Sequence, residues 1–324
     1  MKKILTLALS LALAVTAAGC SSKEEAKKTE ETKQYTVGVC QFVQHPALDS
    51  ATEGFKDALI DKLGADGVVF DEQNASGDSV NCSTIINSFV SKNVDLIMAN
   101  ATPALQAAAA GTTTIPILGT SVTEYGVALE LSDFNGTVGG NISGTSDLAP
   151  LDQQAQLILD LFPETKTVGL LYCSAEPNSA YQVKIVKEEL GKKGVKSTEY
   201  AFSDANDIAA VCTAACAASD VIYVPTDNSA ASSAGIIDGI CRPAKVPVIA
   251  GEEGICKGCG VASLTISYYD LGYKTGEMAA EILAEGKDIS TMPIAYAPEI
   301  TKKYNAEICA ELGVKVPEDF VAVE

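Results

Sequence analysis

From Tyr35 onward, short apolar runs rich in valine and isoleucine alternate with amphipathic segments, and this alternation restricts the fold more than any other feature of the chain. Runs of this length, separated by helical patterns, are typical of parallel sheets that helices cover on both faces. The runs are TVGVCQ, GVVF, VDLIMA, IPILGT, TVGLLYC, STEYAF, DVIYVP and VPVIAG. The segment after the first run predicts a helix, because Pro46 suits a first helical turn and apolar residues follow at helical spacing. That apolar stripe comprises Ala47, Leu48, Ala51, Phe55, Ala58, Leu59 and Leu63.

The second half of the chain repeats the first. Val37-Gly38 matches Val168-Gly169 at an offset of 131, and Ile115-Pro116 matches Val246-Pro247 at the same offset. The stretch DLIMANATPA matches DVIYVPTDNS at an offset of 125. Two Rossmann-like halves can also look alike without an internal repeat. Both interpretations predict the same α/β fold class, with two doubly wound Rossmann-like lobes that each carry a crevice at the carboxyl ends of the strands.

The first 34 residues predict export and anchoring. Residues 1–19 combine Lys2 and Lys3 with a short apolar stretch and small residues before Cys20, as in a signal peptide. A transmembrane anchor is the alternative, but the apolar stretch is shorter than the roughly 20 residues a bilayer span needs. The small residues before Cys20 resemble a bacterial lipobox, although Ala17 stands where leucine is usual. This resemblance implies a lipid on Cys20. Residues 20–34 read as a flexible tether, so we expect an extracytoplasmic protein that is lipid-anchored to the outer face of the cell membrane.

The charge balance limits the partners. The chain has 42 acidic and 23 basic side chains, a formal net charge of -19. Binding to phosphate backbones needs clustered Lys and Arg, so nucleic acid is excluded as a predicted partner. Arg242 is the only arginine, and it precedes a strand, at the end of the sheet opposite the crevice. Any ligand carboxylate should therefore be held by hydroxyls, amides and backbone N–H groups.

Small hydroxyl, amide and acidic residues follow the apolar runs. In open α/β sheets these loops line the ligand site. A single such loop is explained as well by helix capping, but several converging from two lobes favour a small polar ligand clamped between them. The candidate ligand-binding residues are Gln41, Phe42, His45, Thr102, Pro103, Ser121, Val122, Ser174, Glu176, Asn178, Ser179, Thr226, Asp227, Asn228, Gly251 and Glu252.

Catalytic motifs are missing from the sequence. His45 is the sole histidine, no G-x-S-x-G elbow precedes a helix, and no glycine-rich phosphate loop follows a strand. Binding without catalysis, cofactor or metal is the simpler prediction. A thiol enzyme or zinc protein stays open as an alternative, because Cys256 and Cys259 form a C-x-x-C pair, which is half a zinc site. Cys212, Cys216 or Cys241 would have to supply the other half.

Motifs from both halves resemble one family in the right order. They include VCQFVQHPALDSATEGFKDAL, NASGD, ATPALQAAAA, SDL, SAEPNSAYQV, VPTDNSAASS, PVIAGEEG and YYDLGYKTGEMAAEIL. Over nearly all of residues 35–310 the chain is similar to the TrpX-type solute-binding lipoproteins of ABC importers. The resemblance implies a type I periplasmic-binding-protein fold, a likeness to binders of aromatic amino acids, and ABC permease subunits as partners of a monomer. It places lobe 1 at 35–145 plus 268–291 and lobe 2 at 146–267 plus 292–324. A receptor lipoprotein that senses another small molecule without transport is the alternative.

A zwitterionic amino acid buried between lobes needs a partner for each charge. Asp227 is the leading candidate for the ammonium group and Glu252 the second, because both follow strands of the second half. The carboxylate is expected to contact Thr102, Ser121, Ser174, Asn178 and Ser179, whereas Gln41, Phe42 and His45 contact the ligand side chain. A helix-capping role is the alternative for His45.

Overall fold

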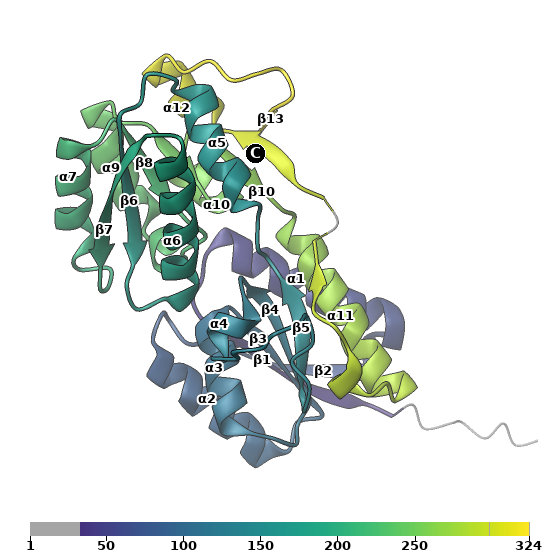
Figure 1. Ribbon diagram of the computed structural model, residues 1–324. Coiled ribbons are helices and arrows are strands. Elements are labelled where there is room, and N and C mark those ends of the chain that lie inside the picture. Colours follow the sequence, from purple (N-terminus) through teal and green to yellow (C-terminus); the bar gives the residue numbers. More distant parts are fainter. Residues whose placement is uncertain (1–32, 298, 324) are drawn as a thin grey trace, which may run out of the picture. The chain divides into compact units, whose positions relative to one another are not determined.

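The computed structural model describes residues 33–297 and 299–323, which fold around two separate sheets (Figure 1). The predicted signal peptide at 1–19, Cys20 and nearly all of the tether lie outside the described residues.

The first sheet has six strands in the order β11-β5-β4-β3-β1-β2, and all of its pairings are parallel. Its strands are β1 (Tyr35–Gln41), β2 (Val68–Asn74), β3 (Leu96–Asn100), β4 (Ile117–Val122), β5 (Ile142–Ser146) and β11 (Ala295–Tyr296).

The second sheet has seven strands in the order β13-β12-β10-β9-β8-β6-β7. Its strands are β6 (Thr167–Cys173), β7 (Lys196–Phe202), β8 (Val221–Val224), β9 (Val248–Ala250), β10 (Ala262–Thr265), β12 (Thr301–Tyr304) and β13 (Val321–Ala322). Only β12 runs antiparallel to its neighbour β10 among these pairings.

Helices flank each sheet, and we call each sheet with its helices a lobe. The first lobe holds α1 (Pro46–Leu63), α2 (Ser79–Lys92), α3 (Thr102–Gly111), α4 (Tyr125–Ala128) and α11 (Tyr268–Glu285). The second holds α5 (Leu151–Leu161), α6 (Pro177–Lys192), α7 (Ile208–Ala218), α8 (Asn228–Ser232), α9 (Ala234–Ala244), α10 (Glu253–Cys259) and α12 (Ala306–Leu312). Among the described residues, every helix is too short or too polar to cross a membrane.

The expected fold class is confirmed, and each of the eight apolar runs forms a strand. The orders β2-β1-β3-β4-β5 and β7-β6-β8-β9-β10 are the same arrangement, so the matched sequence pairs fall on equivalent strands. One boundary differs from expectation. Ala295 and Tyr296 pair with Thr145 and Ser146 of β5, so the chain leaves the first sheet after residue 296 and not near 292.

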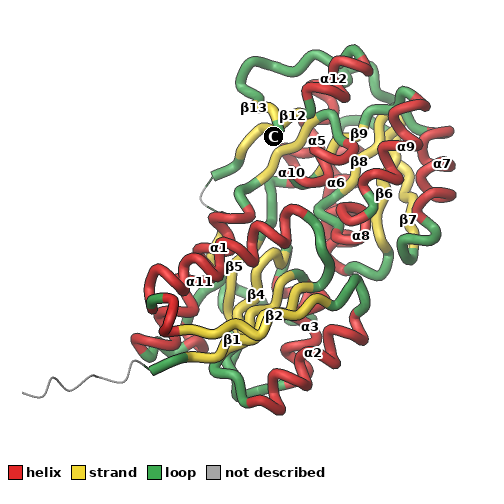
Figure 2. Tube along the Cα trace, turned by 180° about the vertical axis from the view of Figure 1, so that it is seen from behind, coloured by secondary structure: helices red, strands yellow, loops and turns green. Residues whose placement is uncertain are grey.

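Strand alternation explains why helices cover both faces of each sheet. In β3, Ile97 and Ala99 pack in one apolar cluster with α2 and α3, whereas Leu96 and Met98 pack in another with α1 and α11 (Figure 2). The second sheet is built the same way, with α5, α6 and α12 on one face and α7, α9 and α10 on the other. The carboxyl ends of the strands are thus left as the open edge of each lobe.

Helices α1 and α11 approach each other backbone to backbone. A methyl group on Gly54 would overlap the carbonyl oxygen of Tyr269, and one on Gly272 would overlap the carbonyl oxygen of Ala51. Only glycine leaves room for this contact, which joins α11 firmly to the first lobe although its sequence follows β10 of the second sheet.

We expect Gly272→Ala to destabilise the protein by about 1–3 kcal/mol, because the helices must separate to admit the methyl group. Gly239→Ala is the matched control: Gly239 lies inside α9, and an added methyl group meets no atom there. That control should leave stability unchanged or raise it by up to about 1 kcal/mol. Urea unfolding of both variants measures the difference, and equal midpoints would contradict the close contact.

Candidate functional site

Residues from the carboxyl ends of strands in both sheets surround one cavity. Its volume is about 10 Å³, room for about one water molecule, so a larger ligand enters only when the lining side chains or the lobes move apart. The lining residues are His45, Leu48, Ser121, Thr123, Asp147, Asn178, Thr226, Asp227, Asn228, Ala231, Glu252 and Tyr268.

Seven of the sixteen candidate residues line this cavity: His45, Ser121, Asn178, Thr226, Asp227, Asn228 and Glu252. The other nine do not: Gln41, Phe42, Thr102, Pro103, Val122, Ser174, Glu176, Ser179 and Gly251. Several of these nine are committed to internal bonds, Gln41 and Glu176 among them. The Gln41 amide nitrogen donates to Asp49 at 2.7 Å and its oxygen accepts from the Thr52 hydroxyl, so the side chain braces the start of α1.

Glu176 lies behind the cavity and fixes Asn228. Its carboxylate accepts from the Asn228 backbone N–H at 3.1 Å and from Asn228 Nδ2 at 2.6 Å. The other oxygen accepts from the backbone N–H and hydroxyl of Ser229. Because Glu176 is 1 % exposed and its two oxygens are occupied, it orients the wall of the cavity without facing a ligand.

The hydrogen bond between the lobes sets the tautomer of His45. Asn228 Nδ2 points to Glu176, so its Oδ1 must accept from His45 Nε2, 3.2 Å away. In the neutral ring Nδ1 is then a hydrogen-bond acceptor. Burial lowers the pKa of His45, which favours this neutral form. The side chain of His45 makes no helix-capping bond to α1.

Four of the six buried side-chain polar atoms that lack a partner in the described residues belong to this cavity. They are His45 Nδ1, Asp147 Oδ1, Asn178 Oδ1 and Ser121 Oγ. Leaving a buried polar group unpaired costs about 1–3 kcal/mol, so such a concentration marks a place for a ligand. Three of the four atoms are acceptors, and the fourth is a hydroxyl. The cavity therefore calls for a ligand with several N–H or O–H donors.

Three buried carboxyl groups also line the cavity, and none of its lining residues is lysine or arginine. Burial raises the pKa of Glu252 to about 7, and it raises the pKa values of Asp227 and Asp147 as well. For Asp227 the nearby charge of Glu176 adds to this effect, while backbone N–H groups oppose it. A cation entering the cavity would oppose these shifts, because an opposite charge favours the ionised carboxylate.

The three carboxyl groups differ in how they are occupied. Asp227 accepts from the backbone N–H groups of Cys173 and Ala230, one on each oxygen. Glu252 accepts from the N–H groups of Gly254 and Ile255 at the start of α10. In Asp147, Oδ2 accepts from the Tyr268 hydroxyl at 2.8 Å and Oδ1 has no partner. Asp147 thus has the oxygen that is free to meet a ligand.

Backbone strain accompanies the site in the first lobe. Ser121 has φ 54 although it is not glycine, and Ala101 at the end of β3 has φ 88. Such conformations cost of order 1–3 kcal/mol and persist where surrounding structure enforces them. The Ser121 hydroxyl, 5 % exposed, is one of the unpartnered atoms of the cavity, so the strained backbone belongs to the residue that presents it.

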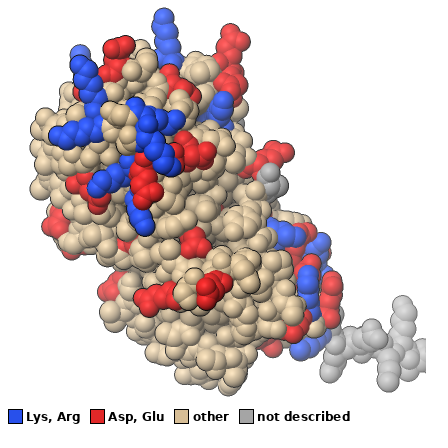
Figure 3. All heavy atoms as spheres, viewed as in Figure 1, with Lys and Arg blue, Asp and Glu red and all other residues tan. Residues whose placement is uncertain are grey.

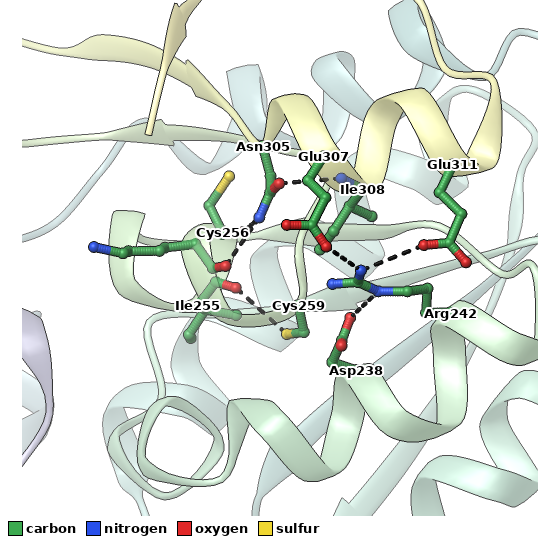
Figure 4. A network of polar contacts seen from close by, with 10 residues as sticks. Asp238, Arg242, Ile255, Cys256, Cys259, Asn305, Glu307, Ile308 and Glu311 are labelled. Carbon is green, nitrogen blue, oxygen red and sulfur yellow. Dashed lines mark hydrogen bonds and ion pairs between the residues drawn. The ribbon is translucent and has the colours of Figure 1, made fainter. Parts of the chain in front are cut away.

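Sequence reasoning missed five lining residues: Leu48, Thr123, Asp147, Ala231 and Tyr268. Asp147 and Tyr268 had a signal, because they stand in the SDL and YYDLGYKTG motifs at the expected crossings between lobes. Arg242 lies away from the cavity, as expected. Its guanidinium contacts Asp238 in α9 and Glu307 and Glu311 in α12 (Figure 4).

On the face drawn in Figure 3, lysine and arginine side chains of the second lobe are interleaved with acidic ones, and most of the first lobe is uncharged. The described ion pairs are mostly exposed, as in Lys187 with Glu199 and Lys302 with Asp319. Pairs of this kind contribute little to stability.

Comparisons with known proteins agree on one family. A family model described as ABC transporter substrate binding protein matches residues 36–323. A tyrosine-binding protein from Clostridioides difficile (strain R20291) is 38% identical over 310 residues, covering 92% of this chain and 88% of the relative.

Two solved structures are similar. One is a Streptococcus pneumonia ABC domain in complex with L-Trp, with 33% identity, a TM-score of 0.84, and coverage of 88% of this chain and 97% of that chain. The other is a ligand-free, open substrate binding protein with adhesive properties from Clostridium difficile, with 38% identity, a TM-score of 0.68, and coverage of 90% and 99%. Together with a 14% identical isoleucine complex at a TM-score of 0.58, they confirm the expected type I periplasmic-binding-protein fold.

The raised carboxyl pKa values predict how stability depends on pH. Between about pH 4 and pH 7 the folded protein keeps protons on Glu252 and Asp227 that the unfolded chain has lost, and the raised pKa of Asp147 acts in the same direction. Stability contributed by these groups is therefore lost as pH rises through this window. His45, with a lowered pKa, acts in the opposite direction. We expect the melting temperature to fall from pH 5 to pH 8, and the fall to be smaller in Glu252→Gln.

Glu285→Gln is the control for this measurement, because Glu285 is exposed at the end of α11. It should reproduce the unmodified protein at each pH. If Glu252→Gln gives the same pH profile as Glu285→Gln, the buried carboxyl of Glu252 does not hold a proton in the folded state.

Proposed function

The chain belongs to the family of ABC transporter substrate binding proteins, and on that basis we propose that it captures an amino acid with an aromatic side chain between its lobes for delivery to a permease. The single observation that carries the ligand class is the set of unpartnered acceptors in the cavity. An ammonium group offers three N–H donors and a positive charge. It therefore fits a cavity with three free acceptors and three carboxyl groups.

Within this proposal, Asp147 is the first partner of the ammonium group. Its Oδ1 is buried and unpaired, whereas the oxygens of Asp227 are held by backbone N–H groups of the second lobe. Asp227, the leading candidate on sequence grounds, stays in the proposal as a second negative charge that lines the cavity. An ion pair buried in this way is strong when hydrogen bonds satisfy both partners.

The other parts of the ligand have counterparts too. With no arginine or lysine in the lining, the ligand carboxylate would take the Ser121 hydroxyl and backbone N–H groups. Leu48, Ala231 and the ring of Tyr268 supply apolar and aromatic surface for a side chain. His45 Nδ1 and Asn178 Oδ1 could accept from a phenol or an indole N–H where the ammonium does not occupy them.

The relatives support this ligand class. One is named for tyrosine, and another was solved with L-Trp. The TM-score is higher with the L-Trp complex than with the open, ligand-free structure, although the identity is lower. We infer that the described lobes stand in a closed arrangement, and that capture proceeds by hinge closure on the ligand.

The location of the protein completes the proposal. We infer cleavage of the signal peptide at 1–19 and a lipid on Cys20, so that the tether at 20–34 holds a monomer at the outer face of the cell membrane. ABC permease subunits are the proposed partners. No catalytic step, cofactor or metal is needed for this capture.

A panel of L-amino acids tests the ligand. The chain has no tryptophan, so added L-tryptophan is the only indole in the sample, and its emission should shift to the blue on burial. We expect a Kd of about micromolar for at least one of tryptophan, tyrosine and phenylalanine, near -8 kcal/mol. Calorimetry measures the affinity of the two ligands that lack an indole. The D-enantiomers serve as controls. Equal responses to the L- and D-enantiomers, or no response to any amino acid, would contradict the proposal.

Asp147→Asn tests the ammonium partner. Removing one charge of a buried pair costs about 3–5 kcal/mol, so affinity should fall by at least about 100-fold. Asp152→Asn, in the exposed first turn of α5, is the matched control and should bind normally.

Asp227→Asn distinguishes a binding role from a structural one. Because Asp227 caps α8 and accepts from Cys173, its loss should lower the melting temperature of the ligand-free protein. Asp147→Asn should not lower it, since burial already disfavours the ionised form of this carboxyl group. Full affinity in Asp147→Asn would rule out this residue as the ammonium partner.

A further inference from the structure

Three cysteines of the second lobe meet away from the ligand cavity. Cys212 and Cys216 belong to α7, and Cys241 belongs to the last turn of α9. Cys241 Sγ lies 3.5 Å from Cys212 Sγ and 3.2 Å from Cys216 Sγ, and the three sulfur atoms all lie within 4.8 Å of one another. We call these residues the thiol cluster.

The helices bring the thiol cluster together for simple geometric reasons. Residues 212 and 216 are four apart in α7, so they project from the same face of the helix. That face packs against α9 in an apolar cluster that covers the second sheet. Cys212 and Cys241 are buried and Cys216 is half-buried, so the cluster is reached from solvent on the Cys216 side.

The other described cysteines of this lobe do not join the cluster. Cys259 Sγ donates to the carbonyl oxygen of Ile255 at 3.4 Å (Figure 4), and Cys309 Sγ donates to that of Val261 at 3.2 Å. Cys256 is buried and directed to Gly260. The C-x-x-C pair at 256 and 259 is thus separate from the cluster that the sequence alternative would have combined with it.

The nine described cysteines are free, so no two sulfur atoms of the cluster form a disulfide. Hydrogen bonds from its two neighbours lower the pKa of Cys216 to about 4, whereas the pKa of Cys212 is raised to about 12. The pKa of Cys241 is raised as well.

We propose that the thiol cluster is a binding site for a soft d10 metal ion, Zn²⁺ or Cu⁺, held by the three sulfur atoms of Cys212, Cys216 and Cys241. Thiolates are the ligands that such ions prefer. At a metal–sulfur distance of about 2.3 Å, tetrahedral ligands lie about 3.8 Å apart, so the sulfur atoms need to open by only a few tenths of an ångström. The partial negative charge at the carboxyl end of α9 also favours a cation there.

Binding is balanced by proton release. Each sulfur atom bonds to the ion as a thiolate, so any thiol of the cluster loses its proton to water as it binds. With Zn²⁺ the three thiolates carry a net charge of about -1, and a water molecule from the Cys216 side would complete the tetrahedron. With Cu⁺ the three sulfur atoms can complete the coordination without a fourth ligand.

The bound ion would cross-link α7 and α9. Because α9 follows α8, which carries Asn228 and Ala231 of the ligand cavity, the ion would stabilise the wall of the second lobe. This inference does not depend on which amino acid the protein captures.

The test uses the full chain, reduced, freed of metal with a chelator and kept without oxygen. Zn²⁺ and Cu⁺ are added in separate arms, each against a competing chelator, and bound metal, released protons and melting temperature are measured. We expect one ion per chain in at least one arm, release of protons as the ion binds, and a higher melting temperature.

Cys216→Ala is the main variant, because this residue is the least buried of the three and its loss should disturb folding least. It should lose stoichiometric metal binding. Cys309→Ala is the matched control, a buried cysteine of the same lobe that lies outside the cluster, and it should keep the ion.

The two arms identify the ion. Binding in either arm that depends on Cys216 supports the site. Equal binding by both variants, or none in either arm, overturns it. Conversion of the cluster to a disulfide between Cys216 and Cys241 under air, with no metal bound in its reduced form, would likewise overturn it.

Discussion

The cost of leaving buried polar atoms unpaired governs this site more than any other interaction. Asp147, Asn178, Ser121 and His45 come from different strand ends, yet each presents one unsatisfied atom to the same cavity. At about 1–3 kcal/mol each, these atoms oppose the lobe arrangement unless a ligand pairs with them. Glu176 holds Asn228 and thereby the His45 ring, so the surrounding bonds preserve the unpaired state. A ligand that pairs with these atoms would therefore stabilise this arrangement of the lobes.

The same cavity concentrates negative charge where a basic residue would ordinarily balance it. Burial raises the pKa values of Asp147, Asp227 and Glu252, and an entering ammonium group would favour their ionised forms. Ligand capture is thereby linked to proton release, so affinity should rise with pH over the range in which stability falls. The scarcity of arginine in the sequence agrees with this arrangement, since the single guanidinium joins α9 to α12.

The fold was largely predictable because the apolar runs and helical periods are local patterns. All eight runs form strands, and α1 begins at Pro46 as expected. The sequence did not predict the short strands β5, β10, β11, β12 and β13. Polar segments such as ISGTS lack a clear period.

Seven candidate site residues line the cavity because they follow strands. Asp147 and Tyr268 were missed because their pairing depends on where the chain crosses between lobes. Gln41 and Glu176 were included because loop position alone does not reveal a side chain's bonds.

The glycine contact between α1 and α11 has a mechanical consequence. Helix α11 starts at Tyr268, three residues after β10 ends, and its first turns pack closely against the first lobe. In the closure proposed above, rotation of the second lobe must then pivot close to Tyr268 and Asp147. Residues close to the pivot move little, whereas Asn178 and Asn228 move with the second lobe. We expect the ligand to contact Asp147 and Tyr268 first, because these residues stay in place. The second-lobe residues then contact the ligand as the lobes close.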